Sequence, residues 1–198
     1  YPVNEHAKSG IFLGDITYYA RDNVTGLAGF HSNPCRYAYA NEVGLYQLAA
    51  LVWNNNNYSQ HAQEVWESAF DYLQPEVKDS YFKIASNIAN APNSSRVPGF
   101  NETEYLAEEL AAVEALVKEG ASLKTNAQAQ SLLKEFKDII AAIADFRANC
   151  ANQDLVSELE PWLKSLDDIA HAGEAALESL IAMEDGDAST GWEKLSAA

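Results

Sequence analysis

The sequence predicts a mainly all-α protein, in which an antiparallel helical bundle follows a shorter segment rich in loops. Three observations predict this architecture. From about residue 42 onward, apolar residues recur every three or four positions, as on the buried face of a helix. Residues 1–41 show no such period. The charge balance also changes close to this position. Residues 54–198 carry 25 acidic and 10 basic residues, whereas residues 1–53 carry four acidic and three basic residues.

The beginning of the chain has the least regular pattern. Tyr1-Pro2-Val3 is typical of a strand end, and residues 11–14 form a short apolar run that closes with glycine. Residues 15–30 show no sustained period. The first helix is expected after His31-Ser32-Asn33-Pro34. Its apolar positions are Val43, Leu45, Leu48, Leu51 and Val52.

Two further helices are expected on either side of Pro75, because proline interrupts a helical hydrogen-bond pattern. The helix before it carries Val65, Trp66, Phe70 and Leu73 on one face. The helix after it carries Val77, Tyr81, Ile84 and Ile88. Residues 90–100 contain two prolines and several small polar side chains, which predicts a loop.

Longer apolar stripes over residues 106–117, 132–146 and 155–180 complete the expected bundle. The residues suited to begin these helices are Asn101, Thr125 and Asn152. Gly120 suits the left-handed position that closes the first of them. Pro161 lies inside the third stripe, where the helix is expected to restart or kink.

The net charge of −16 excludes several classes of partner. A strongly acidic surface repels phosphate backbones and anionic lipids, so neither a nucleic acid nor a membrane is expected as a partner. The longest apolar runs fall short of the roughly 18 to 20 residues that a membrane span requires. The chain begins at Tyr1 without an initiator methionine, so we expect a processed protein or an internal piece of a longer one.

Motifs for metal or cofactor chemistry are missing from the sequence. The four histidines are scattered, and none belongs to an HExxH motif or a Cys/His cluster. The chain has no GxSxG sequence and no glycine-rich phosphate loop. We therefore expect no metal and no cofactor. Cys35 and Cys150 are too few for a disulfide framework, and the sequence leaves open whether they pair.

Aromatic residues and one acidic pair are the remaining candidates for a site. Exposed rings form stacking platforms for sugars, but the helical spacing of Trp53, Trp66 and Trp162 favours the core. Adjacent carboxylates can divide acid and base roles. Asp167-Asp168, however, lies between two positions of an apolar stripe, so a solvated helix face is expected there.

Residues 1 to about 57 resemble a known pattern. Tyr1-Pro2-Val3-Asn4-Glu5 is similar to N-[FY]-P-V-x-D, and Gly29-Phe30-His31-Ser32-Asn33-Pro34 is similar to G-F-x-x-N-P-M. Trp53-Asn54 is similar to the W-N-P that follows at the expected distance. Farther along, Glu158-Leu159-x-Pro161-Trp162 is similar to E-I-x-P-W. On these motifs the chain resembles glycoside hydrolase family 84, the β-N-acetylglucosaminidases that include bacterial O-GlcNAcases and hyaluronidase-like enzymes.

The resemblance implies the C-terminal part of a longer enzyme. Residues 1–55 would form the end of the last strand, the loop and the final helix of a catalytic (β/α)8 barrel. Residues 56–198 would form the helical bundle domain that follows the barrel. The remainder of the barrel would then be a partner of this chain. Without it, the apolar residues Ile11, Phe12 and Leu13 are expected to lack a partner.

The resemblance also implies a mechanism and two substrate-binding residues. In that family the sugar's 2-acetamido oxygen attacks the anomeric carbon, and an Asp-Asp pair after an earlier barrel strand orients the acetamido group and supplies the general acid and base. No catalytic residue is therefore expected in this chain, since Asp167-Asp168 lies on a bundle helix. Asn33 matches the asparagine that hydrogen-bonds a sugar hydroxyl. Glu5 stands where the family has an aspartate that binds two hydroxyls, and the longer side chain departs from the pattern.

The expected function is that of a secreted or cell-surface enzyme that removes terminal β-linked N-acetylglucosamine from glycans or glycoproteins. The chain alone is expected to be inactive. An alternative stays open at this point. The acidic, regularly patterned residues 54–198 are also typical of a stand-alone helical module for protein interaction or spacing. Such a module should tolerate deletion of residues 1–41.

Overall fold

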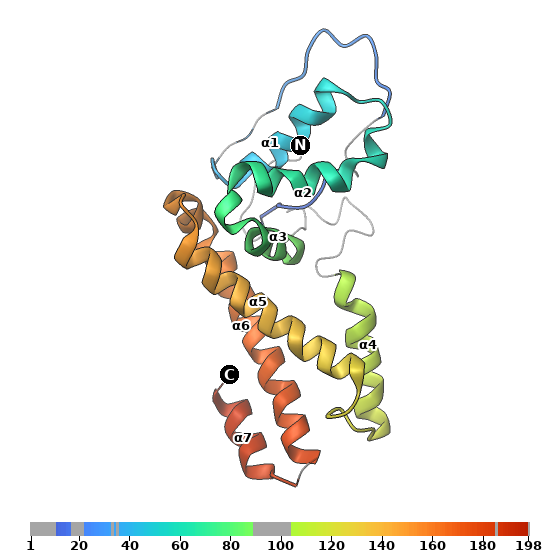
Figure 1. The fold of residues 1–198 in the computed structure, drawn as a ribbon, viewed down its shortest axis with the longest axis vertical. Coiled ribbons are helices and arrows are strands. Elements are labelled where there is room, and N and C mark those ends of the chain that lie inside the picture. Colours follow the sequence, from blue (N-terminus) through green and yellow to red (C-terminus); the bar gives the residue numbers. More distant parts are fainter. Residues whose placement is uncertain are drawn as a thin grey trace. The chain divides into compact units, whose positions relative to one another are not determined.

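A computed structural model describes residues 11–16, 22–32, 34, 36–88, 104–184 and 186–197 (Figure 1). Within these residues the chain is helical and contains no strand, which confirms the expected mainly all-α fold. The helices are α1 (Asn41–Trp53), α2 (Ala62–Leu73), α3 (Lys78–Asn87), α4 (Glu104–Glu119), α5 (Ala127–Asn149), α6 (Gln153–Glu184) and α7 (Ala188–Ala197). The strand end expected at Tyr1-Pro2-Val3, the loop at residues 90–100 and the cap at Asn101 lie outside the described residues.

The chain divides into two compact units. The first unit comprises Tyr1–Glu102 and Asp145–Trp162, and the second comprises Thr103–Ala144 and Leu163–Ala198. Helices α5 and α6 therefore each contribute residues to both units. The predicted domain boundary between residues 55 and 56 stays a prediction.

Aromatic rings form much of the core of the first unit. The ring of Phe70 in α2 meets that of Tyr81 in α3 edge-on, with centroids 5.0 Å apart. Tyr81 in turn lies 5.0 Å from Phe146, and Trp66 lies 4.9 Å from Phe82. Phe70, Tyr81 and Phe146 are all fully buried. The apolar stripes read from the sequence on either side of Pro75 therefore face this core, as expected.

Residues 11–16 cross this unit as an extended segment without regular secondary structure. Phe12 and Ile16 are buried in one cluster with Leu48, Tyr58 and Ala62 from the next three elements of the chain. Leu13 is buried completely. The expectation that Ile11, Phe12 and Leu13 lack a partner is therefore wrong, because α1, α2 and the turn between them supply the apolar surface that covers the segment.

The buried backbone of this segment is paired by side chains. The amide of Gln47, itself fully buried, accepts a hydrogen bond from the N–H of Ile16 at 3.0 Å and donates one to the carbonyl of Gly14 at 3.1 Å. The indole N–H of Trp66 donates to the carbonyl of Leu13 at 2.8 Å. The N–H of Leu13 also donates to the backbone carbonyl of Ile88 at 3.4 Å. Together these bonds pair buried backbone groups of a segment that has no neighbouring strand among the described residues, since a buried backbone group without a partner is strongly unfavourable.

Helix ends largely follow the sequence predictions. Gly120 has φ +66°, and the N–H groups of Gly120 and Ala121 donate to the carbonyls of Val117 and Leu116, as in a Schellman motif. Asn152 caps α6 by accepting the N–H of Leu155 at 3.1 Å. The cap predicted at Thr125 is wrong by one residue. Asn126 fills it, because its side-chain oxygen reaches the N–H groups of residues 128 and 129 at 2.9 and 3.2 Å.

Pro161 does not end a helix. Helix α6 is continuous from Gln153 to Glu184, so of the two alternatives expected at Pro161 the restart is excluded and the kink stays a prediction. The face of α6 that carries Pro161 is exposed to solvent. Water can therefore hydrogen-bond the backbone carbonyl that has no N–H partner because proline lacks an N–H group.

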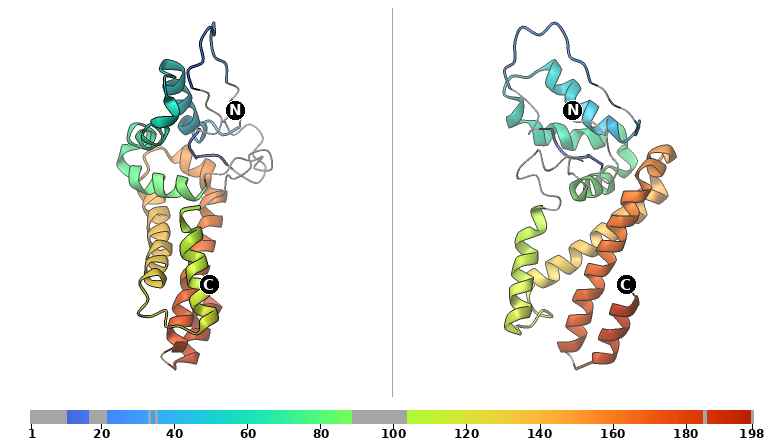
Figure 2. Two further views of the ribbon diagram at one scale, coloured as in Figure 1. Left: turned by 90° about the vertical axis from the view of Figure 1, so that its right-hand side faces the viewer. Right: turned by 180° about the vertical axis from the view of Figure 1, so that it is seen from behind.

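The second unit is held together by close packing and by charge. A Cβ atom on Gly173 of α6 would lie 2.5 Å from Cζ of Phe136 in α5, so only glycine allows the ring to sit there. Glu178 accepts hydrogen bonds from Lys137 of α5 at 2.7 Å and from Lys194 of α7 at 2.5 Å. Figure 2 shows α7 beside the C-terminal part of α6, where Glu178 joins the two helices.

We predict that Gln47→Leu destabilises the chain by about 2 to 4 kcal/mol, because it leaves the N–H of Ile16 and the carbonyl of Gly14 buried without partners. Urea unfolding followed by circular dichroism measures the change. The control is Gln63→Leu on exposed α2 surface, which should change stability by less than about 0.5 kcal/mol. Equal effects of the two substitutions would contradict the role given to Gln47.

Gly173→Ala should destabilise the second unit by about 1 to 3 kcal/mol, because the new methyl group overlaps the Phe136 ring. The overlap outweighs the roughly 1 kcal/mol that alanine gains over glycine in a helix. A double-mutant cycle with Phe136→Leu isolates the contact. The double variant should be less destabilised than the sum of the single variants, and additive effects would rule out the overlap.

Candidate functional site

Neither of the two predicted substrate-binding residues can be located. Glu5 and Asn33 both lie outside the residues that the structure describes. Residues on either side of Asn33 are described, and they form two features of the first unit. One is a slot formed by residues 24–30 and the end of α1, lined by both apolar and asparagine side chains. The other is a set of contacts between residues 37–40 and the beginning of α6.

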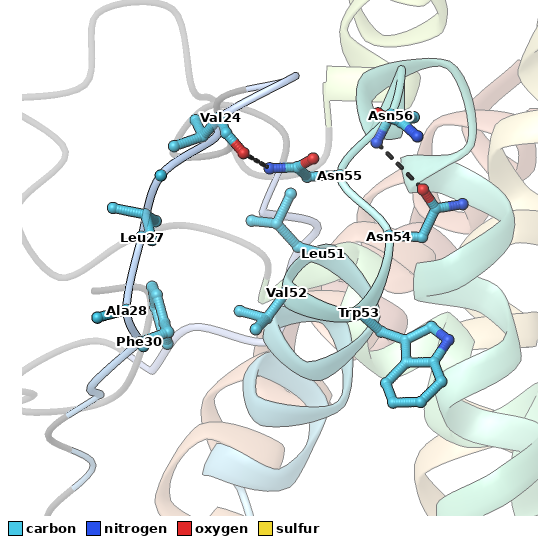
Figure 3. A pocket seen from close by; sticks show the side chains of 12 residues that line it. Val24, Leu27, Ala28, Phe30, Leu51, Val52, Trp53, Asn54, Asn55 and Asn56 are labelled. Carbon is cyan, nitrogen blue, oxygen red and sulfur yellow. Dashed lines mark hydrogen bonds between the residues drawn. The ribbon is translucent and has the colours of Figure 1, made fainter.

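The slot lies between residues 24–30 and the C-terminal end of α1, and its volume is about 460 Å³ (Figure 3). Leu51 and Val52 of α1 point toward the loop that carries Val24 and Leu27. Several of its apolar side chains are exposed, including Leu27 at 67% and Phe30 at 50%. The lining residues are Val24, Gly26, Leu27, Ala28, Gly29, Phe30 and residues 51–56.

The prediction that Trp53 belongs to the core is wrong. Its side chain is 92% exposed and points away from residues 24–30, so it is not a core residue (Figure 3). The reason is its position at the end of α1. It lies five positions after the buried Leu48, which turns it about 140° around the helix from that side chain. Trp66 is buried as expected, and Trp162 is half-buried.

Asparagine side chains and backbone hold the loop of the slot to the turn after α1. The N–H of Asn23 donates to the carbonyl of Asn55 at 2.9 Å. The Asn55 amide donates to the carbonyl of Val24 at 2.7 Å, as Figure 3 shows. Asn23 and Asn57 adopt left-handed φ angles of +58° and +52°, which asparagine tolerates better than most residues. The asparagine-rich sequence after Trp53 is therefore typical of a turn.

Asp22 adds a charged contact at the start of the same loop. Its carboxylate accepts hydrogen bonds from the hydroxyl of Ser59 and from the Ser59 N–H, the latter at 2.9 Å. These two bonds, of which the one from the hydroxyl has the larger effect, hold the pKa of the Asp22 carboxyl below its ordinary value.

Residues 37–40, directly before α1, contact the first turns of α6. The Glu158 carboxylate accepts the N–H groups of Ala38 at 2.8 Å and of Tyr39 and Ala40 at 3.0 Å each. The ring of Tyr37 meets Trp162 edge-on, with centroids 5.3 Å apart. These contacts join the start of α1 to the motif that contains Pro161-Trp162, which lies more than a hundred residues later in the sequence.

The pKa values of Glu42 and Tyr39, two groups near the Glu158 carboxylate, are both raised. Burial raises the pKa of Glu42, and the negative charge of Glu158 raises it further. The hydroxyl of Tyr39 donates to Asp154 at 3.3 Å, and the charge of Asp154 is the main cause that raises the pKa of Tyr39.

The pair Asp167-Asp168 belongs to the second unit. Asp168 is 63% exposed and lies 2.6 Å from Lys164, which fits the expected solvated helix face. Asp167 is less exposed, at 23%, and its carboxylate lies 3.6 Å from His171. The two adjacent carboxylates therefore have separate partners.

Metal ligands and thiols give no further site in the part of the chain that is described. There, no three His, Cys, Asp or Glu side chains are grouped as a metal ion would need. Cys150 is a buried free thiol 3.6 Å from the Gln74 amide oxygen, and Cys35 lies outside the described residues. No helix among the residues searched is both long and apolar enough to cross a membrane.

Comparisons with known proteins match both ends of the chain. Residues 1–86 match the family described as beta-N-acetylglucosaminidase, and residues 108–198 match the family described as hyaluronidase post-catalytic domain-like. The fold is similar to the structure of CpGH84D, with a TM-score of 0.85 and 24% identity over 99% of this chain. It is also similar to that of CpGH84B, with a TM-score of 0.76 and 20% identity over 98%. The chain spans 32% and 33% of those two chains.

Sequence reasoning missed both the slot and the contacts of Glu158. Nothing in the spacing of residues 24–30 indicates which elements they contact, because the loop has no period. Glu158 did carry a signal, since it is the acidic residue of the motif that ends in Pro161-Trp162. The sequence indicates a helical stripe and a family motif there, but neither predicts the hydrogen bonds to residues 38–40.

Replacing Ser59 by alanine should raise the pKa of Asp22 toward its ordinary value, because the hydroxyl is the main cause of the lowering. Because the pKa is lowered in the folded chain, the Asp22–Ser59 contact stabilises the loop above the ordinary aspartate pKa. That stabilisation is lost as the pH falls through the folded value. An NMR titration of the Asp22 carboxyl carbon measures the shift.

Asp187 is the matched control within the chain. Its pKa is lowered in the same way, by the hydroxyl and the N–H of Thr190. It should be unchanged by Ser59→Ala. An Asp22 pKa that does not move in the variant would show that the Ser59 hydroxyl has no such effect.

Proposed function

Because the chain is a β-N-acetylglucosaminidase-like member of glycoside hydrolase family 84, we propose that it is part of a longer enzyme that hydrolyses terminal β-linked N-acetylglucosamine from glycans or glycoproteins. One observation supports this most directly: a match to the β-N-acetylglucosaminidase family is followed along the chain by a match to a post-catalytic domain. The alternative of a stand-alone helical module has no comparable support.

The proposed reaction is substrate-assisted hydrolysis with retention. The 2-acetamido oxygen of the sugar attacks the anomeric carbon, and the bond to the leaving group breaks as a general acid protonates the departing oxygen. Water then opens the resulting oxazoline, giving up a proton to the same group acting as a base. The aspartate pair that this chemistry needs would lie outside residues 1–198, so the chain alone would be inactive.

Within this chain, we assign sugar binding to Asn33 and Glu5. The Asn33 amide would hydrogen-bond a sugar hydroxyl, and the Glu5 carboxylate would accept hydrogen bonds from two neighbouring hydroxyls. The described residues Gly29, Phe30 and Pro34 belong to the same motif as Asn33, which supports its assignment. The proposed location is secreted or on the cell surface, where such glycans occur. An O-GlcNAcase-like or hyaluronidase-like specificity would fit the same pocket chemistry.

An activity assay tests the proposal. The purified chain should release no aryl group from an aryl β-N-acetylglucosaminide above the rate of a heat-denatured sample. The protein encoded together with the upstream coding sequence should release it readily. Turnover by the chain alone would contradict the proposed absence of catalytic residues.

The upstream coding sequence separates the two functions considered for the chain. A series of βα units with an Asp-Asp pair after one strand is expected there. A start codon or signal peptide directly before Tyr1 would instead favour the interaction module. In that case the sugar-binding roles of Asn33 and Glu5 would also be excluded.

A further inference from the structure

We propose that residues 145–162, the α5–α6 clasp, form an interface by which the post-catalytic part of the chain stabilises the part that matches the β-N-acetylglucosaminidase family. The α5–α6 clasp consists of the end of α5, the turn after it and the first turns of α6. These residues match the post-catalytic family, whose match covers residues 108–198. In the structure, however, they belong to the same compact unit as α1, α2 and α3. The clasp therefore unfolds with those helices rather than with the rest of the post-catalytic part.

The clasp contributes side chains to the aromatic core of the first unit. Phe146 is fully buried, and its ring lies 5.0 Å from that of Tyr81 in α3, which in turn meets Phe70 of α2. Leu155 and Leu159, from the first turns of α6, are buried as well. Burial of large apolar side chains is the main favourable contribution to folding. The clasp is therefore part of the core of this unit and not a layer on its surface.

Two hydrogen bonds join the clasp to residues near the start of α3. The carboxylate of Glu76 accepts the N–H of Ala151 at 2.7 Å, and the hydroxyl of Ser80 donates to the Asp145 carboxylate at 2.5 Å. The bond from Ser80 is the main cause that holds the pKa of Asp145 below its ordinary value. Both bonds involve a carboxylate, and such bonds are stronger than those between neutral groups. They tie the turn of the clasp to the region that matches the β-N-acetylglucosaminidase family.

The first turns of α6 hold the start of α1. Both oxygens of the Glu158 carboxylate accept backbone N–H groups of residues 38–40, at 2.8 to 3.0 Å. The start of a helix presents unpaired N–H groups and a partial positive charge, and Ala40 has no side chain that caps them. One turn later on α6, Trp162 packs edge-on against Tyr37 with ring centroids 5.3 Å apart. The clasp therefore supplies the cap that α1 lacks in its own sequence.

Pro161 lies where the clasp ends. The border between the two compact units divides α6 between Trp162 and Leu163. Because proline has no N–H, residue 161 cannot donate the helical hydrogen bond to the carbonyl of Ser157. Helix α6 therefore has fewer backbone hydrogen bonds beside this border, and local opening is easiest where such bonds are fewest. The clasp and the C-terminal part of α6 can consequently open separately, although they belong to one helix.

A matched pair of substitutions in α5 tests which helices open together with the clasp. Phe146→Leu removes the ring that contacts Tyr81 in the first unit. Phe136→Leu, ten residues earlier, removes the ring that packs on Gly173 in the second unit. Both variants replace the same residue type on the same helix and keep an apolar side chain. Native-state hydrogen exchange of the full 198-residue chain, resolved by NMR, measures the opening of each helix.

We expect Phe146→Leu to speed amide exchange about tenfold at Ile84 in α3 and at Leu155 in α6, because these amides share one opening reaction. The amide of Leu177, in the second unit, should change by less than about twofold. Phe136→Leu should give the reverse pattern. If Ile84 keeps its wild-type exchange in Phe146→Leu, the clasp does not stabilise α3 and the proposal is wrong. Equal acceleration of all three amides by both variants would also overturn it, because the chain would then open as one unit.

Labelling of Cys150 provides a second measurement of clasp opening. The Cys150 thiol lies in the turn of the clasp, is 2% exposed and lies 3.6 Å from the amide oxygen of the buried Gln74. A thiol reagent therefore reaches it only when the clasp opens. Mass spectrometry after trypsin digestion assigns the label, because cleavage at Arg147 and at Arg36 separates the peptides that contain Cys150 and Cys35.

A second pair of variants keeps the test decisive if Phe146→Leu does not fold. Glu158→Gln removes one accepting oxygen from the start of α1 with almost no change in volume, so labelling of Cys150 should become about tenfold faster. The control is Glu160→Gln, which removes the same charge from a side chain that is 48% exposed and pairs with Arg147 at 2.8 Å. It should leave the labelling rate within about twofold of wild type. Equal labelling rates for the two variants would overturn the proposal.

Discussion

An extended backbone can be buried only if every N–H and carbonyl group along it finds a partner, and the first unit is organised around that requirement. Residues 11–16 have no neighbouring strand among the described residues, so side chains from two helices and the backbone carbonyl of Ile88 supply the partners. The side-chain polar groups of Gln47 in α1 and Trp66 in α2 hydrogen-bond to this backbone. The positions of α1 and α2 are consequently tied to a segment that has no secondary structure of its own.

The acidic character of the chain has a structural use beyond solubility. Several carboxylates accept backbone N–H groups of segments far away in the sequence. Glu158 accepts those of residues 38–40, Glu184 accepts that of Leu123 at 2.5 Å, and Glu76 accepts that of Ala151 at 2.7 Å. Each joins parts of one unit, and charge-assisted hydrogen bonds of this kind are stronger than neutral ones. Part of the excess negative charge therefore fixes loops and helix starts.

Much of the helical architecture could be predicted from the sequence because it depends on local chemistry. The apolar stripes, the glycine at position 120 and the cap at Asn152 each act within a few residues. Thr125 was misassigned because two adjacent residues can both cap a helix and only the backbone geometry selects Asn126. Trp53 was misassigned because helical spacing says which residues share a face but not where a helix ends.

The candidate site was less predictable because it depends on contacts across long stretches of sequence. More than a hundred residues separate Glu158 from the amides that it accepts, and no pattern in either segment indicates their meeting. The packing of residues 11–16 has the same origin. The family resemblance supplied the roles of Asn33 and Glu5, but composition and spacing alone would have left both as ordinary polar residues.

The contrast between two tryptophans gives the first unit its own optical reporters. Trp53 is 92% exposed and borders the slot, whereas Trp66 is 7% exposed and bonded to the backbone of Leu13. An indole in water emits at longer wavelength and is open to collisional quenchers, while a buried, hydrogen-bonded indole is shielded from them. Fluorescence from Trp53 thus reports on the solvent-exposed end of α1, and fluorescence from Trp66 reports whether the buried segment remains in place.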